Sequence, residues 1–302
     1  MRRRIVQHGS SSLTITLPFR WVEQFGLKKG DELELEVDGP RIVLSTGRDS
    51  SVLRKVVDTT DFGVFTKNNV THLYQLGYDE VEVRFSDELS LRDVKERVAE
   101  CIGFEVIDQR KNSITVRCIA HTLESEFDVL LRKSFLVTKE MAEGVFAALR
   151  SGDNGRLKEL RHLEFMNNKF VVACVRILSR RGYHASQRRT SQMYDILKGI
   201  ERVADEYKYI CDLFAGPGRR LSGDILAFFA EVNAYYAAFY SIFYKFDPRL
   251  KEKIYLDRKM LKEKGSCLLQ KSKGRESVLL HHLLSVIEKV YDSAGEYFAL
   301  ML

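Results

Sequence analysis

The sequence has few residues that form covalent crosslinks or thiolate metal sites. It has five cysteines, and no two of them form a CxxC pair: Cys101, Cys118, Cys174, Cys211 and Cys267. This spacing excludes a disulfide framework and a zinc site of the usual kind, and favours a reducing cytoplasm. Only four prolines and 19 glycines occur in 302 residues, which excludes long low-complexity linkers.

The sequence also lacks an export signal, and it contains a single long apolar run. Polar residues follow the basic residues after Met1, where a secretory signal needs an apolar stretch. Residues 225–246 are apolar enough to cross a bilayer. However, Glu231 and Asn233 lie near the middle of this run and no second span accompanies it. We therefore favour a buried helix with an aromatic face, with a membrane span as the alternative.

Length and composition indicate a globular protein of more than one domain. At about 150 residues per domain, the chain predicts two or three domains, and 45% hydrophobic residues supply a core for each. Lys and Arg number 48 against 42 Asp and Glu, a formal charge of +6. This small excess is compatible with a nucleic-acid partner but does not establish one.

Residues 1–48 are predicted to form strands around one short helix. Apolar residues alternate with polar ones over 13–17 and 31–37, which is typical of half-buried strands. Pro18 stands where a helix begins and Gly26 where it ends. Because so short a segment cannot build a core alone, we expect it to form a homodimer with a second copy.

The amino-terminal segment is polarised in charge. Its acidic residues concentrate over 31–38. A basic face would bind the phosphate backbone of double-stranded DNA, and a paired copy would double the contacts. The alternative is a solvated basic tail. The candidate DNA-binding residues are Arg2, Arg3, Arg4, Arg20, Lys28 and Lys29.

Residues 9–37 resemble the swapped-hairpin DNA-binding domain of the AbrB, MazE and SpoVT superfamily. The positions that carry the resemblance are Pro18, Trp21, Leu27, Gly30 and Asp31. The resemblance implies an interlocked homodimer that lays its basic amino-terminal strands on DNA. Relatives often carry a basic residue directly after the proline. Here Phe19 stands at that position and Arg20 follows it, so the start of this helix departs from the family pattern.

The mixed pattern of residues 49–121 predicts a small α+β unit. This unit either binds a ligand or only spaces the amino-terminal domain from the helical half. A tight turn at Lys111 and Asn112 joins its last two strands. The predicted elements are a helix near 67–76, a strand over 79–85, a helix over 91–102 and strands over 104–109 and 113–119.

Residues 122–302 carry the helical period throughout. Breaks at Gly152, Gly182, 216–218, Asp247 with Pro248, and Gly274 predict six long antiparallel helices. The segments 157–164 and 250–257 are similar, as are 199–207 and 286–294, so the half repeats internally. We expect two three-helix bundles, at about 122–216 and 219–302. The predicted fold is thus multidomain: a swapped-hairpin β domain, an α+β unit and an all-α pair of bundles.

Each predicted bundle carries two carboxylates four residues apart on one helix. Glu201 with Asp205, and Glu288 with Asp292, each lie on one helical face. Such pairs bind hard cations, although a single pair is more often a solvated surface. Their recurrence at the same phase of the apolar stripe favours a shared role.

The helical half resembles the PhoU family of phosphate-uptake regulators, on the runs IERVADE (200–206) and IEKVYDS (287–293). The resemblance implies metal sites, with a divalent or ferric ion such as iron, zinc or magnesium, completed by a second acidic pair. That pair corresponds to Glu164 with Asn168 and to Asp257 with Leu261. Half of each second pair is missing, so we expect weakened or absent metal binding.

Other candidate sites are weaker. His281 and His282 are adjacent and point to different faces, so they cannot chelate one ion as a helical pair four apart would. Residues 216–220, GPGRR, could imitate an anion loop, but a helix stop explains them more simply. The sequence has no phosphate-binding loop and no nucleophile elbow, so we expect no enzyme activity.

Together the two resemblances imply a cytoplasmic transcriptional regulator of phosphate uptake. The first alternative is a PhoU-like adaptor that docks on a phosphate transporter ATPase, a kinase or a sensor protein, with the amino-terminal domain used only for dimerisation. The second is a metal-dependent enzyme built on the carboxylate helices, against which the missing second pairs argue.

Overall fold

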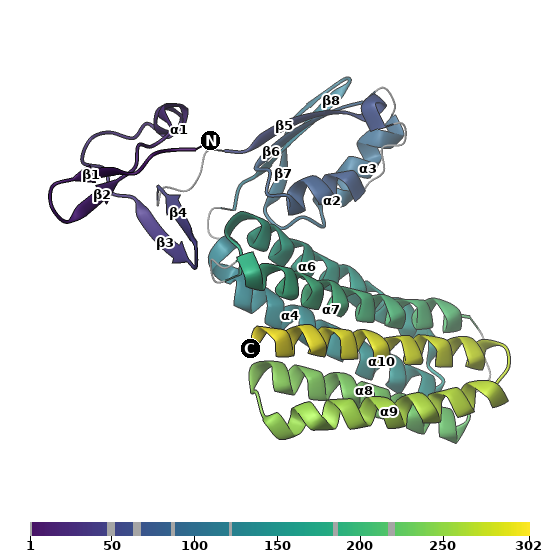
Figure 1. Cartoon of the computed structure of the whole chain (residues 1–302). Coiled ribbons are helices and arrows are strands. Elements are labelled where there is room, and N and C mark those ends of the chain that lie inside the picture. Colours follow the sequence, from purple (N-terminus) through teal and green to yellow (C-terminus); the bar gives the residue numbers. More distant parts are fainter. Residues whose placement is uncertain are drawn as a thin grey trace. The chain divides into compact units, whose positions relative to one another are not determined.

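The computed structural model of the chain divides into two compact units, residues 1–53 and 54–302. It describes residues 2–46, 52–62, 68–85, 88–120, 123–183, 187–216 and 221–302. Figure 1 shows the elements in chain order.

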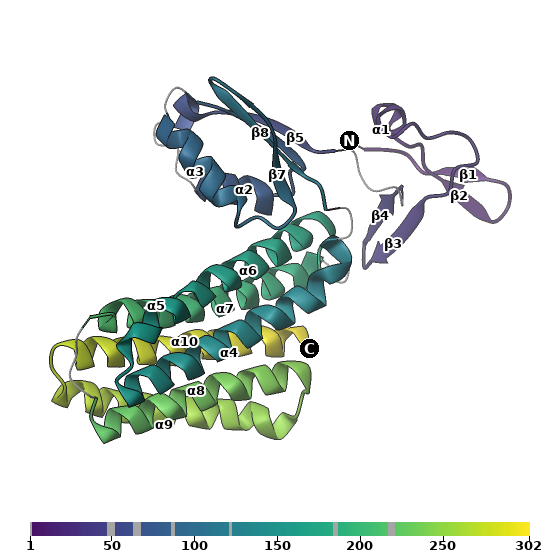
Figure 2. The ribbon, with the colours of Figure 1, turned by 180° about the vertical axis from the view of Figure 1, so that it is seen from behind.

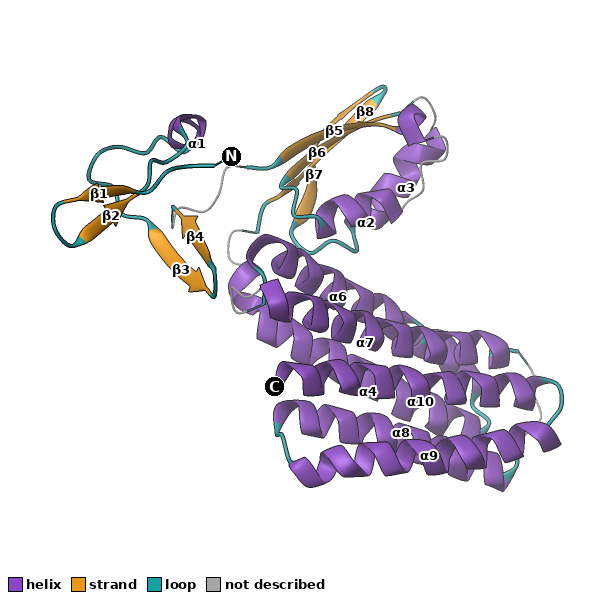
Figure 3. Ribbon diagram, in the orientation of Figure 1, coloured by secondary structure: helices purple, strands orange, loops and turns teal. Residues whose placement is uncertain are grey.

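The amino-terminal unit consists of two antiparallel hairpins around a short helix (Figure 3). Pro18 precedes the helix as predicted. The strand predicted over 13–17 ends at Thr14, because it pairs only with the short strand before it. The elements are β1 (Val6–His8), β2 (Ser12–Thr14), α1 (Phe19–Gln24), β3 (Glu34–Asp38) and β4 (Arg41–Ser45).

The second unit begins with a four-stranded mixed sheet in the order β5-β6-β8-β7. β5 runs parallel to β6, whereas β8 is antiparallel to both β6 and β7. Apolar residues of the sheet, such as Val83 and Ile114, are buried against the helices α2 and α3. The elements are β5 (Arg54–Asp58), α2 (Asn68–Gln75), β6 (Glu80–Arg84), α3 (Glu88–Val98), β7 (Phe104–Arg110) and β8 (Ser113–Cys118). β5 was not expected from the sequence.

The remainder of this unit is helical (Figure 2). The helices α4, α6 and α7 pack against one another, as do α8, α9 and α10, and the two sets meet along α7–α10 and α4–α8. The bounds are α4 (Phe127–Ser151), α5 (Leu157–Leu160), α6 (His162–Arg181), α7 (Gln187–Phe214), α8 (Gly223–Tyr244), α9 (Pro248–Lys271) and α10 (Arg275–Leu300).

The predicted helix breaks at Gly152, Gly182 and Gly274 are confirmed, and each of these glycines has a positive φ. Asp247 caps α9, with Pro248 as its first residue. Residues 217–220 of the predicted GPGRR loop lie outside the described residues.

Among the described residues, α8 is the one helix long and apolar enough to span a membrane, which by itself is weak evidence for a span. Its aromatic side chains Phe228, Phe229, Tyr235 and Phe239 are buried inside the helical part. Tyr236 donates a hydrogen bond to the Phe135 carbonyl of α4 at 3.2 Å. These contacts fit the interpretation of the apolar run as a core helix.

Candidate functional site

The described part of the amino-terminal unit, residues 2–46, is largely exposed to solvent. No described side chain within residues 2–46 is buried. Leu35 pairs across β3 and β4 with Leu44, and Val37 with Ile42, so these residues share one face of the hairpin. Leu35, Val37 and Ile42 are each about 60% exposed (59%, 66% and 62%). A small domain gains stability only by removing such a face from water, and a second copy is the partner that we expect to cover it.

We expect a charge on this face to break the homodimer. In Leu35→Asp, each of the two copies loses a leucine that the dimer would bury. This loss should raise the dissociation constant of the dimer at least about a hundredfold. Sedimentation equilibrium of the full chain measures the change. Glu32→Ala, an exposed position just before the same strand, is the control. If Leu35→Asp sediments like the wild type, residues 54–302 hold the dimer and this assignment is wrong.

All six basic residues proposed for DNA binding are exposed. Arg2, Arg3 and Arg4 precede β1, and Arg20 lies in the first turn of α1. Lys28 and Lys29 lie in the turn after α1, where the Lys28 amide donates to a carboxylate oxygen of Asp31 at 3.0 Å. Their role on DNA remains a prediction.

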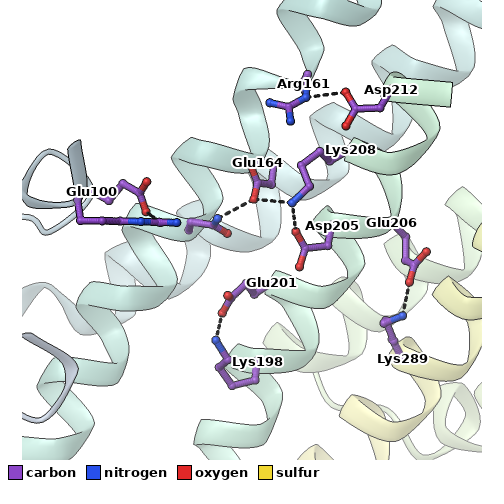
Figure 4. A network of polar contacts seen from close by, with 12 residues as sticks. Glu100, Arg161, Glu164, Lys198, Glu201, Asp205, Glu206, Lys208, Asp212 and Lys289 are labelled. Atoms are coloured by element: carbon purple, nitrogen blue, oxygen red, sulfur yellow. Dashed lines mark hydrogen bonds and ion pairs between the residues drawn. The ribbon is translucent and has the colours of Figure 1, made fainter. Parts of the chain in front are cut away.

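Two of the three carboxylates proposed for the first metal site, Glu164 and Asp205, bind one lysine of the same chain, Lys208 (Figure 4). The Lys208 ammonium donates to Glu164 Oε1 at 3.0 Å and also to Asp205. Asn168 donates its amide to the same Glu164 oxygen at 2.7 Å. Burial alone would lower the pKa of Lys208, but the two carboxylates outweigh it and raise the pKa. Lys208 therefore stays protonated.

Basic residues likewise bind the other proposed ligands. Glu201 pairs with Lys198 within α7. The carboxylate of Glu288 on α10 forms ion pairs with the Arg258 guanidinium at 2.6 Å and the Lys262 ammonium at 2.7 Å, both from α9. Burial alone would raise the pKa of Glu288, but hydrogen bonds from the two cations outweigh it and lower the pKa.

Of the remaining candidates for the second site, only Asp257 is bound by a basic residue that the structure describes. Asp257 pairs with Lys253 one turn earlier at 2.5 Å. Asp292 lies exposed on α10. Leu261 is buried and carries no ligand atom.

These residues, as placed, do not fit a metal ion. Within the described ranges, no group of three or more His, Cys, Asp or Glu side chains is arranged to hold one. An incoming ion would also have to displace an ammonium or guanidinium group from the carboxylates that the sequence proposed as ligands.

Removing Lys208 should create a metal site that the wild type lacks. In Lys208→Ala, Glu164 and Asp205 lose their cation, and with the nearby Asn168 they offer oxygen ligands to a hard divalent ion such as Mn²⁺. We expect about one ion per chain by calorimetry for this variant. Lys198→Ala, which frees only Glu201, is the control. Equal uptake by the two variants, or saturable uptake by the wild type, would contradict this account.

A buried carboxylate that the sequence did not single out joins α7 to α10. Glu206 is 7% exposed. It receives His282 Nδ1 at 2.5 Å, the Ser285 hydroxyl at 2.9 Å and the Lys289 ammonium. Burial alone would raise the pKa of Glu206, but these three hydrogen bonds together outweigh it, so the pKa lies below its ordinary value of 4.5.

The same helices approach closely at a second point. A Cβ added at Gly199 of α7 would lie 1.9 Å from the hydroxyl of Ser293 on α10. This close approach, about two helical turns from Glu206 along α7, requires a glycine at position 199. The sequence pattern of two carboxylates four residues apart pointed to Glu201 and Asp205. It therefore missed the buried carboxylate of Glu206 by one residue.

The Glu206 cluster predicts a loss of stability in acid. A carboxylate with a depressed folded-state pKa stabilises the fold above its unfolded pKa, and this contribution is lost as the pH falls below about 4.5. Glu206→Gln should therefore be less stable at neutral pH by about 2 kcal/mol and lose less stability on acidification than the wild type. Urea unfolding at about pH 7 and pH 3.5 measures both quantities. Glu159→Gln, at an exposed position, serves as control, and equal acid dependence of Glu206→Gln and wild type would refute this assignment.

An arginine of α6 joins the long helices to α2 and to the turn that precedes β6. Arg176 is 3% exposed and donates to the carbonyls of Tyr74 and Tyr78 at 3.0 and 2.6 Å. Its other terminal nitrogen donates to Asp79 at 2.6 Å, and its guanidinium lies 4.9 Å from the Tyr74 ring centre. Arg180 joins the same carboxylate at 2.9 Å. The α+β part and the helices are therefore held together, as one compact unit requires.

Comparison with known proteins identifies only the amino-terminal unit. Residues 6–51 match the family model for MazE, described as antidote-toxin recognition, a bacterial antitoxin. No curated protein and no solved structure matches the chain. The match confirms the predicted AbrB/MazE-type domain, and domains of this type usually dimerise and bind DNA. It does not extend to the helices, whose likeness to the PhoU family stays a prediction.

Proposed function

We propose that the chain is a dimeric DNA-binding transcriptional regulator in the cytoplasm, and that its helical half responds to phosphate supply. The match of residues 6–51 to a MazE-type domain carries the first part. The exposed arginines Arg2, Arg3 and Arg4 supply phosphate contacts, and the exposed face around Leu35 supplies the dimer contact.

The phosphate part of the proposal rests on the PhoU-like repeat of the sequence. Its two runs lie on α7 and α10, the two helices along which the helical sets meet. A change in how α7 and α10 pack would alter both sets at once. The proposal assigns the chain no catalytic step and no metal.

The matched family supports a second candidate, an antitoxin-like regulator. Its family model is described as a bacterial antitoxin, and in that role residues 54–302 would bind a toxin. The adaptor alternative, in which a transporter ATPase or a kinase is the partner, uses the amino-terminal unit for dimerisation alone.

A genome-wide map of DNA occupancy, in phosphate-rich and phosphate-poor cells, separates these candidates. The proposal expects discrete sites near phosphate-uptake genes, whose occupancy changes with phosphate and is lost in the Arg2→Ala, Arg3→Ala, Arg4→Ala variant. Occupancy confined to the chain's own promoter and unaffected by phosphate would favour the antitoxin-like candidate. If the protein occupies no specific DNA sites, the result would favour the adaptor alternative.

A further inference from the structure

The helix α9 lies at the outside of the helical part (Figure 2). Only Ile254, Leu261 and Gly265 of its residues are buried. Leu256 and Met260 lie one turn apart and are 56% and 60% exposed. Beside Met260, a groove of about 460 Å³ separates α9 from α8. This helix therefore presents an apolar centre to its surroundings.

The charges beside this apolar centre are arranged about Leu256 symmetrically to within one residue. Arg249 stands seven residues before Leu256 and Glu263 seven after it. Glu252 stands four before and Lys259 three after. Because seven residues are about two helical turns, these side chains lie along the same face as Leu256. The α9 stripe is defined by Arg249, Glu252, Leu256, Lys259, Met260 and Glu263, which line one shallow hollow of the surface.

We propose that the α9 stripe packs antiparallel against the α9 stripe of a second copy, about a twofold axis at Leu256. In this arrangement Arg249 faces Glu263 of the partner subunit, and Glu252 faces Lys259 of the partner subunit. Twofold symmetry produces each of these contacts twice. Leu256 and Met260 of the two chains form the dry centre between the charged ends.

The charge balance of the stripe favours a second copy over a nucleic acid or a uniformly acidic partner. The helix as a whole is basic, but the stripe carries two cations and two carboxylates. Glu252, Lys259 and Glu263 make no ion pair with any residue that the structure describes. The guanidinium of Arg249 binds only Asp247 among those residues, at 3.2 and 3.3 Å. Phosphates would be repelled by both carboxylates, whereas an antiparallel copy pairs every charge.

The stripe is small, and surface ion pairs contribute little each. Pairing through α9 is therefore expected to be weak between separate chains. Where the amino-terminal units already join two chains, as the proposed function holds, the local concentration of the second α9 rises to the millimolar range and favours the contact.

A cysteine on the proposed axis tests the arrangement. In the full chain carrying Leu256→Cys and Cys267→Ser, the two cysteines would meet at the axis and form an intermolecular disulfide under mild oxidation. The control is Ser266→Cys in the same background. Residue 266 is exposed on the same helix, but in the proposed pair it lies about 30 Å from its mate. We expect crosslinked dimer for Leu256→Cys at least about ten times the control level.

Charge reversal tests the register independently. In the Leu256→Cys background, Arg249→Glu or Glu263→Arg alone should lower the crosslinking rate about tenfold, and the two together should restore it. Equal crosslinking at positions 256 and 266, or no rescue by the double reversal, overturns the proposal.

Adding Leu35→Asp separates this contact from the amino-terminal one. Crosslinking that persists at high protein concentration in this background supports the α9 contact even if the amino-terminal dimer is absent. Absence of crosslinking at position 256 with Leu35 intact, while sedimentation shows an intact amino-terminal dimer, overturns the α9 contact alone.

Discussion

Replacing Arg2, Arg3 and Arg4 by alanine is expected to flatten the salt dependence of DNA binding by about five units on a plot of log Kd against log salt concentration. Three arginines from each of two chains would neutralise six phosphates, and each phosphate contributes about 0.9 to the slope. At low salt, the affinity should fall more than about a hundredfold. Fluorescence anisotropy over a salt series, with a duplex recovered from the occupancy map, measures both.

The control for this prediction replaces three cations elsewhere. Lys158, Arg202 and Lys271 are exposed residues of the second unit, and their joint replacement by alanine makes the same change in net charge. Its slope should match the wild type. If instead the Arg2–Arg4 variant keeps the wild-type slope, the phosphate contacts lie elsewhere, and Arg20, Lys28 and Lys29 become the next candidates.

Arg176→Met should destabilise the second unit by about 3–5 kcal/mol. The substitution keeps much of the side-chain volume but removes the donors to Tyr74, Tyr78 and Asp79. The carbonyls of Tyr74 and Tyr78 then lose this donor, and the largely buried carboxylate of Asp79 keeps Arg180 but loses its second cation. The cost of leaving such groups without a partner exceeds the net value of the bonds themselves. Urea unfolding followed by circular dichroism measures the loss.

Two further variants identify the cause. Arg202→Ala removes an exposed arginine of α7 and should change stability by no more than about 0.5 kcal/mol. In Arg176→Lys the charge is kept, but the lysine reaches fewer of the three acceptors on Tyr74, Tyr78 and Asp79. The stability of this variant should therefore lie between that of Arg176→Met and that of the wild type. If Arg176→Met unfolds like Arg202→Ala, the arginine does not hold α6 to α2 and the turn before β6.

Local patterns predicted most of the secondary structure. The helical period and the glycine and proline breaks located the long helices because each of these signals acts within a few residues of the chain. β5 escaped prediction because its sequence, RKVVD, is short and exposed along most of its length, and it becomes a strand only by pairing with β6.

For the candidate sites, the sequence supplied residues but not their partners. It placed Glu201 with Asp205 on one helical face, and Lys208, three residues beyond Asp205, was a local signal that this carboxylate had a cation of its own. The cations on Glu288 could not be inferred in this way, because Arg258 and Lys262 come from the preceding helix.

The sequence by itself determined the helical character of the carboxyl-terminal half, the MazE-type amino-terminal segment and the basic residues that precede its first strand. Each of these depends on neighbours within one helical turn or one hairpin. Only the tertiary structure decided that Glu206 is the buried carboxylate between α7 and α10 and that Arg176 joins α6 to α2 and the turn before β6. Both roles arise from burial against segments roughly 70 to 100 residues distant in the chain. Local sequence patterns cannot predict burial against such distant segments.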